Sequence, residues 1–139
     1  MIERSGLERE AEQEILDALR KLDLYAVHMN TTIDGFPDIL VAGNRIILVE
    51  MKFDRSGGRV KLKDIMQASQ PVFARAMLSA GFDDIYLCAY NGESYTLYLV
   101  AELLLNTMND KCLSSLPVIK SNNTPEGIAA WIARRSCNV

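Results

Sequence analysis

The chain has 139 residues, of which 49% are apolar and 24% are charged. This balance is typical of one folded domain with its own core, and it excludes a disordered tail protein or a fibrous repeat. The net charge of -3 argues against a general coat for polyanions. No apolar run is long enough to cross a membrane, and the N-terminus lacks a secretory signal. Three widely spaced cysteines predict reduced thiols, a cytoplasmic setting and no zinc site.

The first half of the chain predicts one helix and three strands. In order, these are a helix over residues 6–22, a short strand over residues 24–29, and strands over residues 37–42 and 45–53. Ala11, Ile15 and Leu19 recur at helical spacing in the first segment. Gly43 and Asn44 are typical of a turn between the last two strands, which therefore predict a β-hairpin.

The second half predicts helices and two further strands. These cover a helical region over residues 62–80, strands over residues 85–90 and 95–100, a short helix to residue 108, a polar linker over residues 109–123, and a last helix from Thr124. Because Pro71 lies inside the helical region, either that helix kinks or a second helix begins with Pro71 in its first turn.

The order of these elements predicts an α/β fold class. We expect a mixed β-sheet flanked by helices, with an α-β-β-β-α-β core. That core covers residues 1–100, and a helical C-terminal extension over residues 101–139 packs on it.

Charged side chains interrupt the apolar second strand of the hairpin. Glu50 and Lys52 are two residues apart, so they point to the same face of the sheet. Asp38 opens the partner strand. A two-residue turn would place Asp38 and Glu50 on opposite faces, whereas a three-residue loop would place them directly across from each other. A bulge would also restore that parity.

Two carboxylates and one ammonium group that converge are the parts of a site for phosphodiester hydrolysis. Asp38 and Glu50 would supply the hard oxygen ligands that suit Mg²⁺ or Mn²⁺. Lys52 would orient the attacking water or hold the scissile phosphate. Taken alone, these three residues favour a plain hairpin with a Pro-Asp turn and an exposed Glu–Lys pair, because so short a pattern often arises by chance.

The stretch Gly35-Phe36-Pro37-Asp38, followed by Val49-Glu50-Met51-Lys52, resembles the signature of the PD-(D/E)XK nuclease superfamily. Within it, the sequence looks most like the small VRR-NUC nucleases, with archaeal Holliday-junction resolvases as the next neighbours. The resemblance covers roughly residues 7 to 90 and implies a restriction-endonuclease-like sheet. It also implies a Mg²⁺- or Mn²⁺-dependent DNA endonuclease.

The resemblance assigns two further site residues. An acidic residue on the first helix is carried over to Glu12, as an outer metal ligand through water, with Glu8 one turn earlier as the alternative. A glutamine on the second helix is carried over to Gln70, which would steady the lysine or the water, with Gln67 as the alternative. Small members of the family act on branched or structured DNA as homodimers, and the resemblance implies junction or flap DNA as the partner here.

A basic loop follows the candidate site. Residues 51–64 contain five basic and two acidic residues, whereas the remainder of the chain is acidic. We expect this loop to grip the DNA backbone through Arg55, Arg59, Lys61 and Lys63. His28 is predicted to be a structural or edge residue, and the tyrosines of the late strands are predicted to pack rather than to stack on bases.

Two rival functions remain open from the sequence. The chain could be a non-catalytic nucleic-acid-binding or protein-interaction module that retains the nuclease fold. It could also be an accessory factor whose acidic surface mimics nucleic acid. Binding of a divalent metal would distinguish the nuclease from both.

Overall fold

The computed structural model describes residues 6–30, 35–66 and 69–137. In chain order its elements are α1 (Gly6–Lys21), β1 (Tyr25–His28), β2 (Ile39–Ala42), β3 (Ile46–Phe53), α2 (Leu62–Ile65), α3 (Ser69–Ser79), β4 (Ile85–Tyr90), β5 (Tyr95–Leu99), α4 (Val100–Leu105), the 3-10 helix η1 (Leu113–Ser115), β6 (Lys120–Asn122) and α5 (Pro125–Cys137). Within these ranges, no helix is both long enough and apolar enough to span a membrane.

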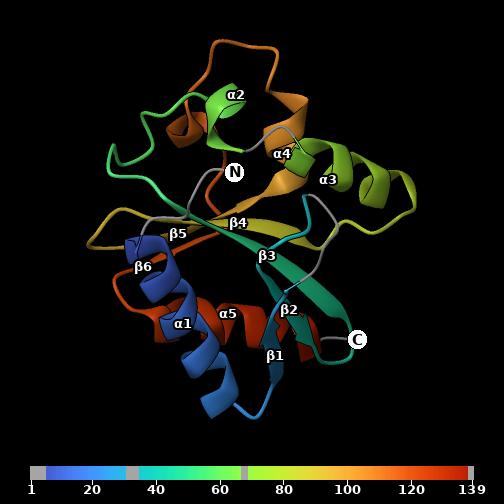
Figure 1. Ribbon diagram of the computed structural model, residues 1–139, viewed down its shortest axis with the longest axis vertical. Coiled ribbons are helices and arrows are strands. Elements are labelled where there is room, and N and C mark those ends of the chain that lie inside the picture. The colour runs from blue at the N-terminus through green and yellow to red at the C-terminus, as the bar shows by residue number, and fades with distance from the viewer. Residues whose placement is uncertain (1–5, 31–34, 67–68, 138–139) are drawn as a thin grey trace.

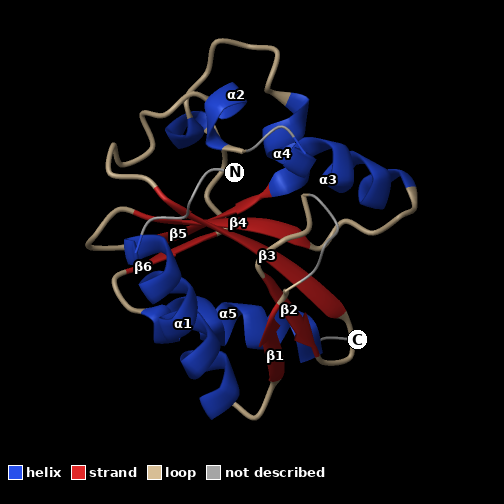
Figure 2. Ribbon diagram, in the orientation of Figure 1, coloured by secondary structure: helices blue, strands red, loops and turns tan. Residues whose placement is uncertain are grey.

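The strands form one mixed sheet of six strands, in the order β1-β2-β3-β4-β5-β6. Only β3 and β4 run parallel, and the other neighbours are antiparallel. Helices α1 and α5 cover one face of the sheet, and α2, α3 and α4 cover the other (Figures 1 and 2). The expected α/β class, a mixed sheet flanked by helices, is therefore confirmed.

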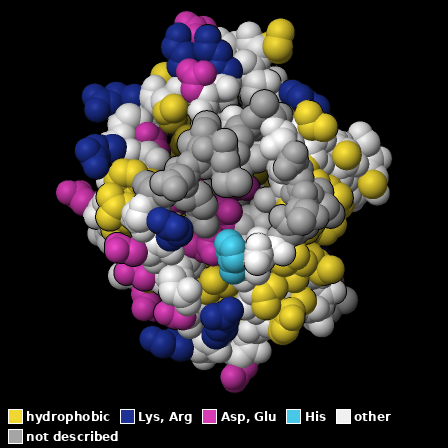
Figure 3. Space-filling view, in the orientation of Figure 1, with side chains coloured by type: hydrophobic (Ala, Val, Ile, Leu, Met, Phe, Trp, Pro, Cys, Tyr) yellow, Lys and Arg dark blue, Asp and Glu magenta, His cyan; other side chains and the backbone are white. Residues whose placement is uncertain are grey.

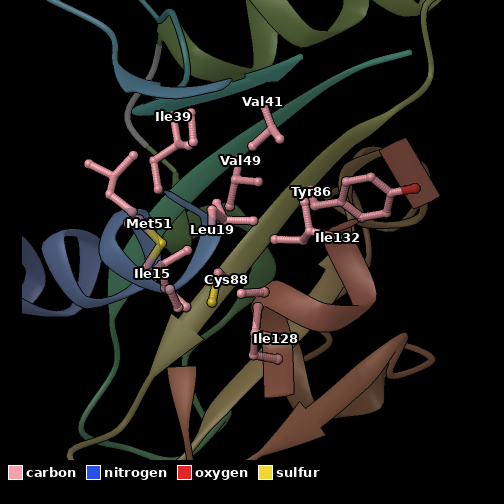
Figure 4. Packing of buried hydrophobic residues seen from close by; sticks show 14 of the residues in the cluster. Ile15, Leu19, Ile39, Val41, Val49, Met51, Tyr86, Cys88, Ile128 and Ile132 are labelled. Carbon is pink, nitrogen blue, oxygen red and sulfur yellow. The ribbon is translucent and has the colours of Figure 1, made fainter. Parts of the chain in front are cut away.

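Alternation along β3 sends its side chains into two separate cores. Val49 and Met51 point toward α1 and α5, where they join Ile15 and Ile128 in a core that is closed to solvent (Figure 4). Leu48 points to the opposite face, toward α2, α3 and α4. Because side chains alternate along a strand, Glu50 and Lys52 share the face of Leu48.

The hairpin between β2 and β3 has the odd-numbered loop that the candidate site requires. Ala42 is paired with Ile46, so the loop consists of Gly43, Asn44 and Arg45. It is closed by a hydrogen bond from the Gly43 N–H to the Arg45 carbonyl, at 3.1 Å. The strands are therefore joined by a three-residue loop and not by a two-residue turn, and this register places Asp38 across from Glu50.

The helical region around Pro71 also follows one of the two expected arrangements. Helix α2 ends at Ile65, and α3 begins at Ser69 with Pro71 in its first turn. The missing N–H of proline costs nothing there, since the first four amides of a helix have no intrahelical acceptor.

The prediction of a polar linker over residues 109–123 is wrong in part. This segment contains η1 and strand β6, whose Ser121 pairs with Thr96 of β5. Helix α5 then packs beside α1, and Ile128 and Ile132 lie in the same core as Ile15. Residues of the C-terminal extension therefore complete the sheet and contribute to both cores, since Leu103, Leu113 and Leu116 are buried in the core on the opposite face.

Asp84 links the end of α5 to the sheet through hydrogen bonds. Its carboxylate accepts hydrogen bonds from Arg135 and from the Tyr86 hydroxyl, both at 2.9 Å, and lies 3.4 Å from Arg45. Burial tends to raise the pKa of Asp84, but the hydrogen bonds from Arg135 and Tyr86 outweigh it, so this pKa is lowered. The Arg45 N–H also donates to the Ser136 carbonyl, at 3.0 Å.

Candidate metal and nucleic-acid site

The candidate site lies where β2 ends and β3 continues. Pairing between the two strands stops at Ile39 and Val49, although β3 extends to Phe53. Beyond that point, the edge of β3 that faced β2 has no strand partner among the described residues. Carboxylate side chains accept hydrogen bonds from the backbone N–H groups on this edge instead. Asp38 Oδ2 accepts from the Met51 N–H at 2.8 Å, and Glu8 Oε2 is 3.5 Å from the Phe53 nitrogen. Acidic side chains thus line the open edge of β3.

Asp38 and Glu50 meet on one face of the sheet. The register that pairs Ile39 with Val49 places Asp38 across from Glu50, and the two side chains share a hydrogen bond. Glu50 is only 3% exposed. Burial and then the Asp38 carboxylate raise the pKa of Glu50 well above its usual value. A proton therefore remains on this pair at a pH where an exposed glutamate would be ionised.

Lys52 stands beside this pair without neutralising it. Its Nζ lies 3.9 Å from Glu50 Oε1, and its side chain is largely buried. The lysine lowers the pKa of Glu50, but burial and Asp38 together exceed this effect. The site therefore combines a buried carboxyl group of raised pKa with an ammonium group 3.9 Å away.

The two candidate carboxylates of α1 have different neighbours. Glu12 is 5% exposed, and its Oε2 lies 2.5 Å from Nδ1 of His28. Glu8 is one of the groups that raise the pKa of Glu50. The structure therefore brings Glu8 into electrostatic contact with the Asp38–Glu50 pair and joins Glu12 to the edge strand β1. The Glu12–His28 pair was not anticipated from the sequence.

The start of α3, which carries Gln70, lies against the backbone at Gly35. Gln70 is buried in the first turn of α3, at 7% exposure. Gly35, three residues before Asp38, has a φ of +83°, and a Cβ there would lie 2.2 Å from the Ser69 carbonyl oxygen. Only glycine permits this contact, which places the start of α3 against the segment that leads to Asp38. The alternative, Gln67, lies outside the described residues.

The donor set fits a hard divalent cation. Asp38 and Glu50 offer carboxylate oxygens, and the raised pKa of Glu50 beside a second carboxylate indicates that positive charge is favoured there. In the described part of the chain, no three His, Cys, Asp or Glu side chains are grouped to hold a metal ion by themselves. A cation here would complete its coordination with water and with substrate oxygens, as Mg²⁺ commonly does.

The four basic residues predicted to contact DNA have unequal surroundings. Lys61 Nζ forms an ion pair with Asp110 at 2.5 Å. The Arg59 Nε donates to the Ser56 carbonyl, and the Arg55 guanidinium lies over the Phe53 ring. Lys63 is exposed. All four follow the end of β3, so this loop begins directly beside the acidic site.

The loop is anchored at its base. The buried Asp54 accepts hydrogen bonds from the N–H groups of Ser56 and Gly58, at 3.0 and 2.7 Å. The Ser114 N–H in turn donates to the Gly58 carbonyl, at 2.8 Å. The basic side chains are thus presented from a backbone that hydrogen bonds hold in shape.

Figure 3 shows Asp and Glu side chains beside the single histidine, His28, near the middle of one face, and others toward the lower left of the same view. Lys and Arg side chains are scattered over this face.

In comparisons with known proteins, no family model matches this chain, and no curated protein matches it. What the site can do is therefore judged from its geometry and chemistry.

Proposed function

We propose that this protein is a metal-dependent DNA nuclease of the PD-(D/E)XK type, with a restriction-endonuclease-like fold. The observation that supports this most is the contact between Asp38 and the buried Glu50, whose pKa is raised by burial and by the Asp38 carboxylate and whose Oε1 lies 3.9 Å from Lys52 Nζ. A chain that needed only a stable hairpin would gain by replacing these groups, because buried like charges oppose folding.

Each site residue has a distinct role in this proposal. Asp38 and Glu50 would hold Mg²⁺ or Mn²⁺, with Glu8 or Glu12 of α1 acting through water. When bound, the cation would supply Lewis-acid chemistry by lowering the pKa of a coordinated water and neutralising charge on the phosphate. Lys52 orients the attacking water or stabilises charge that develops on the phosphate oxygens. Gln70 steadies that geometry from the start of α3.

The substrate would be DNA that approaches the acidic site along the basic loop. Arg55, Arg59, Lys61 and Lys63 would contact backbone phosphates, which position DNA without reading its sequence. Branched or structured DNA, such as junctions and flaps, and a homodimeric enzyme complete the proposal on the basis of the family resemblance.

The decisive experiment is a cleavage assay on labelled blunt duplex, flap and four-way junction DNA. We expect cleavage with Mg²⁺ or Mn²⁺, none with EDTA, and strongly slowed cleavage in Lys52→Ala under the same conditions. Lys21→Ala, an exposed lysine at the far end of α1, is the matched control and should cleave like the parent protein.

Two outcomes would contradict the nuclease. DNA binding without cleavage under any metal would favour the non-catalytic module. Absence of both DNA binding and divalent-metal binding would favour the accessory factor. Isothermal titration calorimetry with Mn²⁺ and with duplex DNA separates these cases. The non-catalytic module should give a binding heat with DNA, whereas the accessory factor should give none with either ligand.

A further inference from the structure

Aromatic rings form a column across the carboxyl ends of β3 and β4 and the start of the antiparallel strand β5. Phe53 and Tyr90 have ring centroids 6.1 Å apart and are tilted by 56°. Tyr90 stacks on Tyr95 at 4.5 Å, with the rings 24° from parallel. Tyr95 is 2% exposed, and its hydroxyl donates to Glu14 of α1. The inner end of the column is therefore fixed in the core, as the sequence predicted for these tyrosines.

The outer end of the column reaches solvent. Phe53 and Tyr90 are only partly buried, and the exposed Arg55 places its Cζ 5.7 Å from the Phe53 ring centroid. Where the strand ends reach the left of Figure 1, hydrophobic side chains meet Lys and Arg side chains at the surface (Figure 3). A cation within about 6 Å of a ring centroid is attracted to the ring face, so this contact favours Arg55 rotamers that keep the guanidinium over Phe53.

From this column we infer a binding site for one unpaired DNA base, stacked on the outer face of the Arg55 guanidinium that Phe53 supports. The inference rests on the proposed nuclease function and narrows its substrate. Bases that are not paired stack on aromatic rings and on arginine planes, and such stacking tolerates any sequence. Arg59, four residues further along the loop, would meet the adjoining phosphate.

The position of the column explains why the base must be unpaired. Arg55 lies three residues beyond Lys52, within about 10 Å along the chain, which is about three nucleotide steps. Phe53 and Lys52 point to opposite faces of β3. A DNA segment would have to turn around the end of that strand to touch both. A flexible single strand can make this turn, whereas a duplex with a persistence length of about 50 nm resists it.

The test compares binding of two DNA probes in the Lys52→Ala background, so that little DNA is cut during the measurement. One probe is a short blunt duplex, and the other is the same duplex with a single-stranded overhang that carries 2-aminopurine, made in both 5′ and 3′ forms. We expect one overhang form to bind about 5- to 100-fold more tightly than the blunt duplex. Its 2-aminopurine fluorescence should fall on binding, because the base stacks.

Two substitutions remove parts of the column. Arg55→Lys keeps the positive charge but removes the planar guanidinium group. Phe53→Leu keeps an apolar side chain but removes the aromatic ring. Both should abolish most of the overhang preference and the fluorescence change, with a smaller effect on blunt duplex. Arg134→Lys on α5 and Phe82→Leu after α3 are the matched controls and should retain the preference. Thermal melting of each variant checks that it is folded.

The outcomes separate this inference from the proposed function. Equal affinity for overhang and blunt duplex, in a protein that cleaves DNA with Mg²⁺, would overturn the base site alone. A preference that survives Arg55→Lys would also overturn it. Absence of any DNA binding and any cleavage would overturn both.

Discussion

Asp84 and Glu50 are buried carboxyl groups on or beside adjacent parallel strands, yet their pKa values are shifted in opposite directions. Asp84 receives hydrogen bonds from Arg135 and Tyr86 that outweigh the effect of its burial. Glu50 faces a second carboxylate, and Lys52 at 3.9 Å offsets only part of the resulting rise. The chain thus neutralises one carboxylate with its own donors and offsets the charge of the other only in part. In the proposed nuclease, this contrast separates a group that stabilises the fold from a group that would bind a cation.

The largest expected effect is the loss of cleavage when the unneutralised pair is changed. Glu50→Gln and Asp38→Asn each remove a ligand charge at nearly constant volume, so DNA cleavage should fall below detection while the fold remains. Metal titration and the cleavage assay check this together. Asp84→Asn, assayed well below its melting temperature, is the control and should still cleave. Wild-type rates in both site variants would show that the pair is not a metal site.

A second substitution tests whether Lys52 belongs to the chemistry or only to the local charge balance. Lys52→Ala should reduce the rate constant for cleavage by about 10²–10³-fold, because it removes one group that stabilises developing charge. Metal affinity should be retained, since the carboxylates are intact. A variant that no longer binds Mn²⁺ in calorimetry would instead make Lys52 a structural partner of Glu50.

The free energy of unfolding should change in opposite directions at the two carboxylates. Asp84→Asn weakens buried, charge-assisted hydrogen bonds and should lower it by about 1–3 kcal/mol. Glu50→Gln removes a like-charge repulsion and should raise it slightly in EDTA. Denaturant titrations of both variants in EDTA measure whether the free energy of unfolding falls in Asp84→Asn and rises in Glu50→Gln. If Glu50→Gln destabilised the protein as much as Asp84→Asn does, the two carboxylates would not differ in their contribution to stability.

The smallest expected effect is in the pH dependence of stability. The native pKa of Glu50 is raised, so in EDTA the native state binds more protons than the unfolded state once pH exceeds about 4.5. The stability of the parent relative to Glu50→Gln should therefore fall as pH rises from there through the raised native pKa, and then level off. Asp84 has a lowered pKa, so its contribution is complete above about 3.8 and is lost as pH falls through the native value. Thermal melting across pH, with the matching amide variants, measures both windows.

The arrangement of the hairpin was largely predictable because strand parity is a local rule. Placing Asp38 across from Glu50 required an odd-numbered loop, and the pairing of Ala42 with Ile46 provides one. The two possible roles of Pro71 were likewise set by local sterics. The Glu12–His28 pair could not be predicted, since it joins residues on different elements whose relative rotation depends on the packing of α1. The same holds for Asp84, whose partner Arg135 is 51 positions away.

Strand β6 illustrates a limit of pattern-based prediction. Lys120, Ser121 and Asn122 are polar and show no alternation of apolar side chains. Such a short edge strand is formed because the chain passes beside β5, not because its own sequence prefers extended structure. The predicted linker over residues 109–123 was therefore wrong at a place where tertiary context overrides local preference.

The contact between α1 and α5 also orders events during synthesis. About a hundred residues of chain separate these helices, yet their side chains share one core. A chain leaves the ribosome with its N-terminus first, so Ile15 and Leu19 emerge long before Ile128 and Ile132. The surface of α1 that faces α5 stays open to solvent, and to chaperones, until translation has passed α5. Contacts this distant in sequence also slow folding, because the intervening loop must close first.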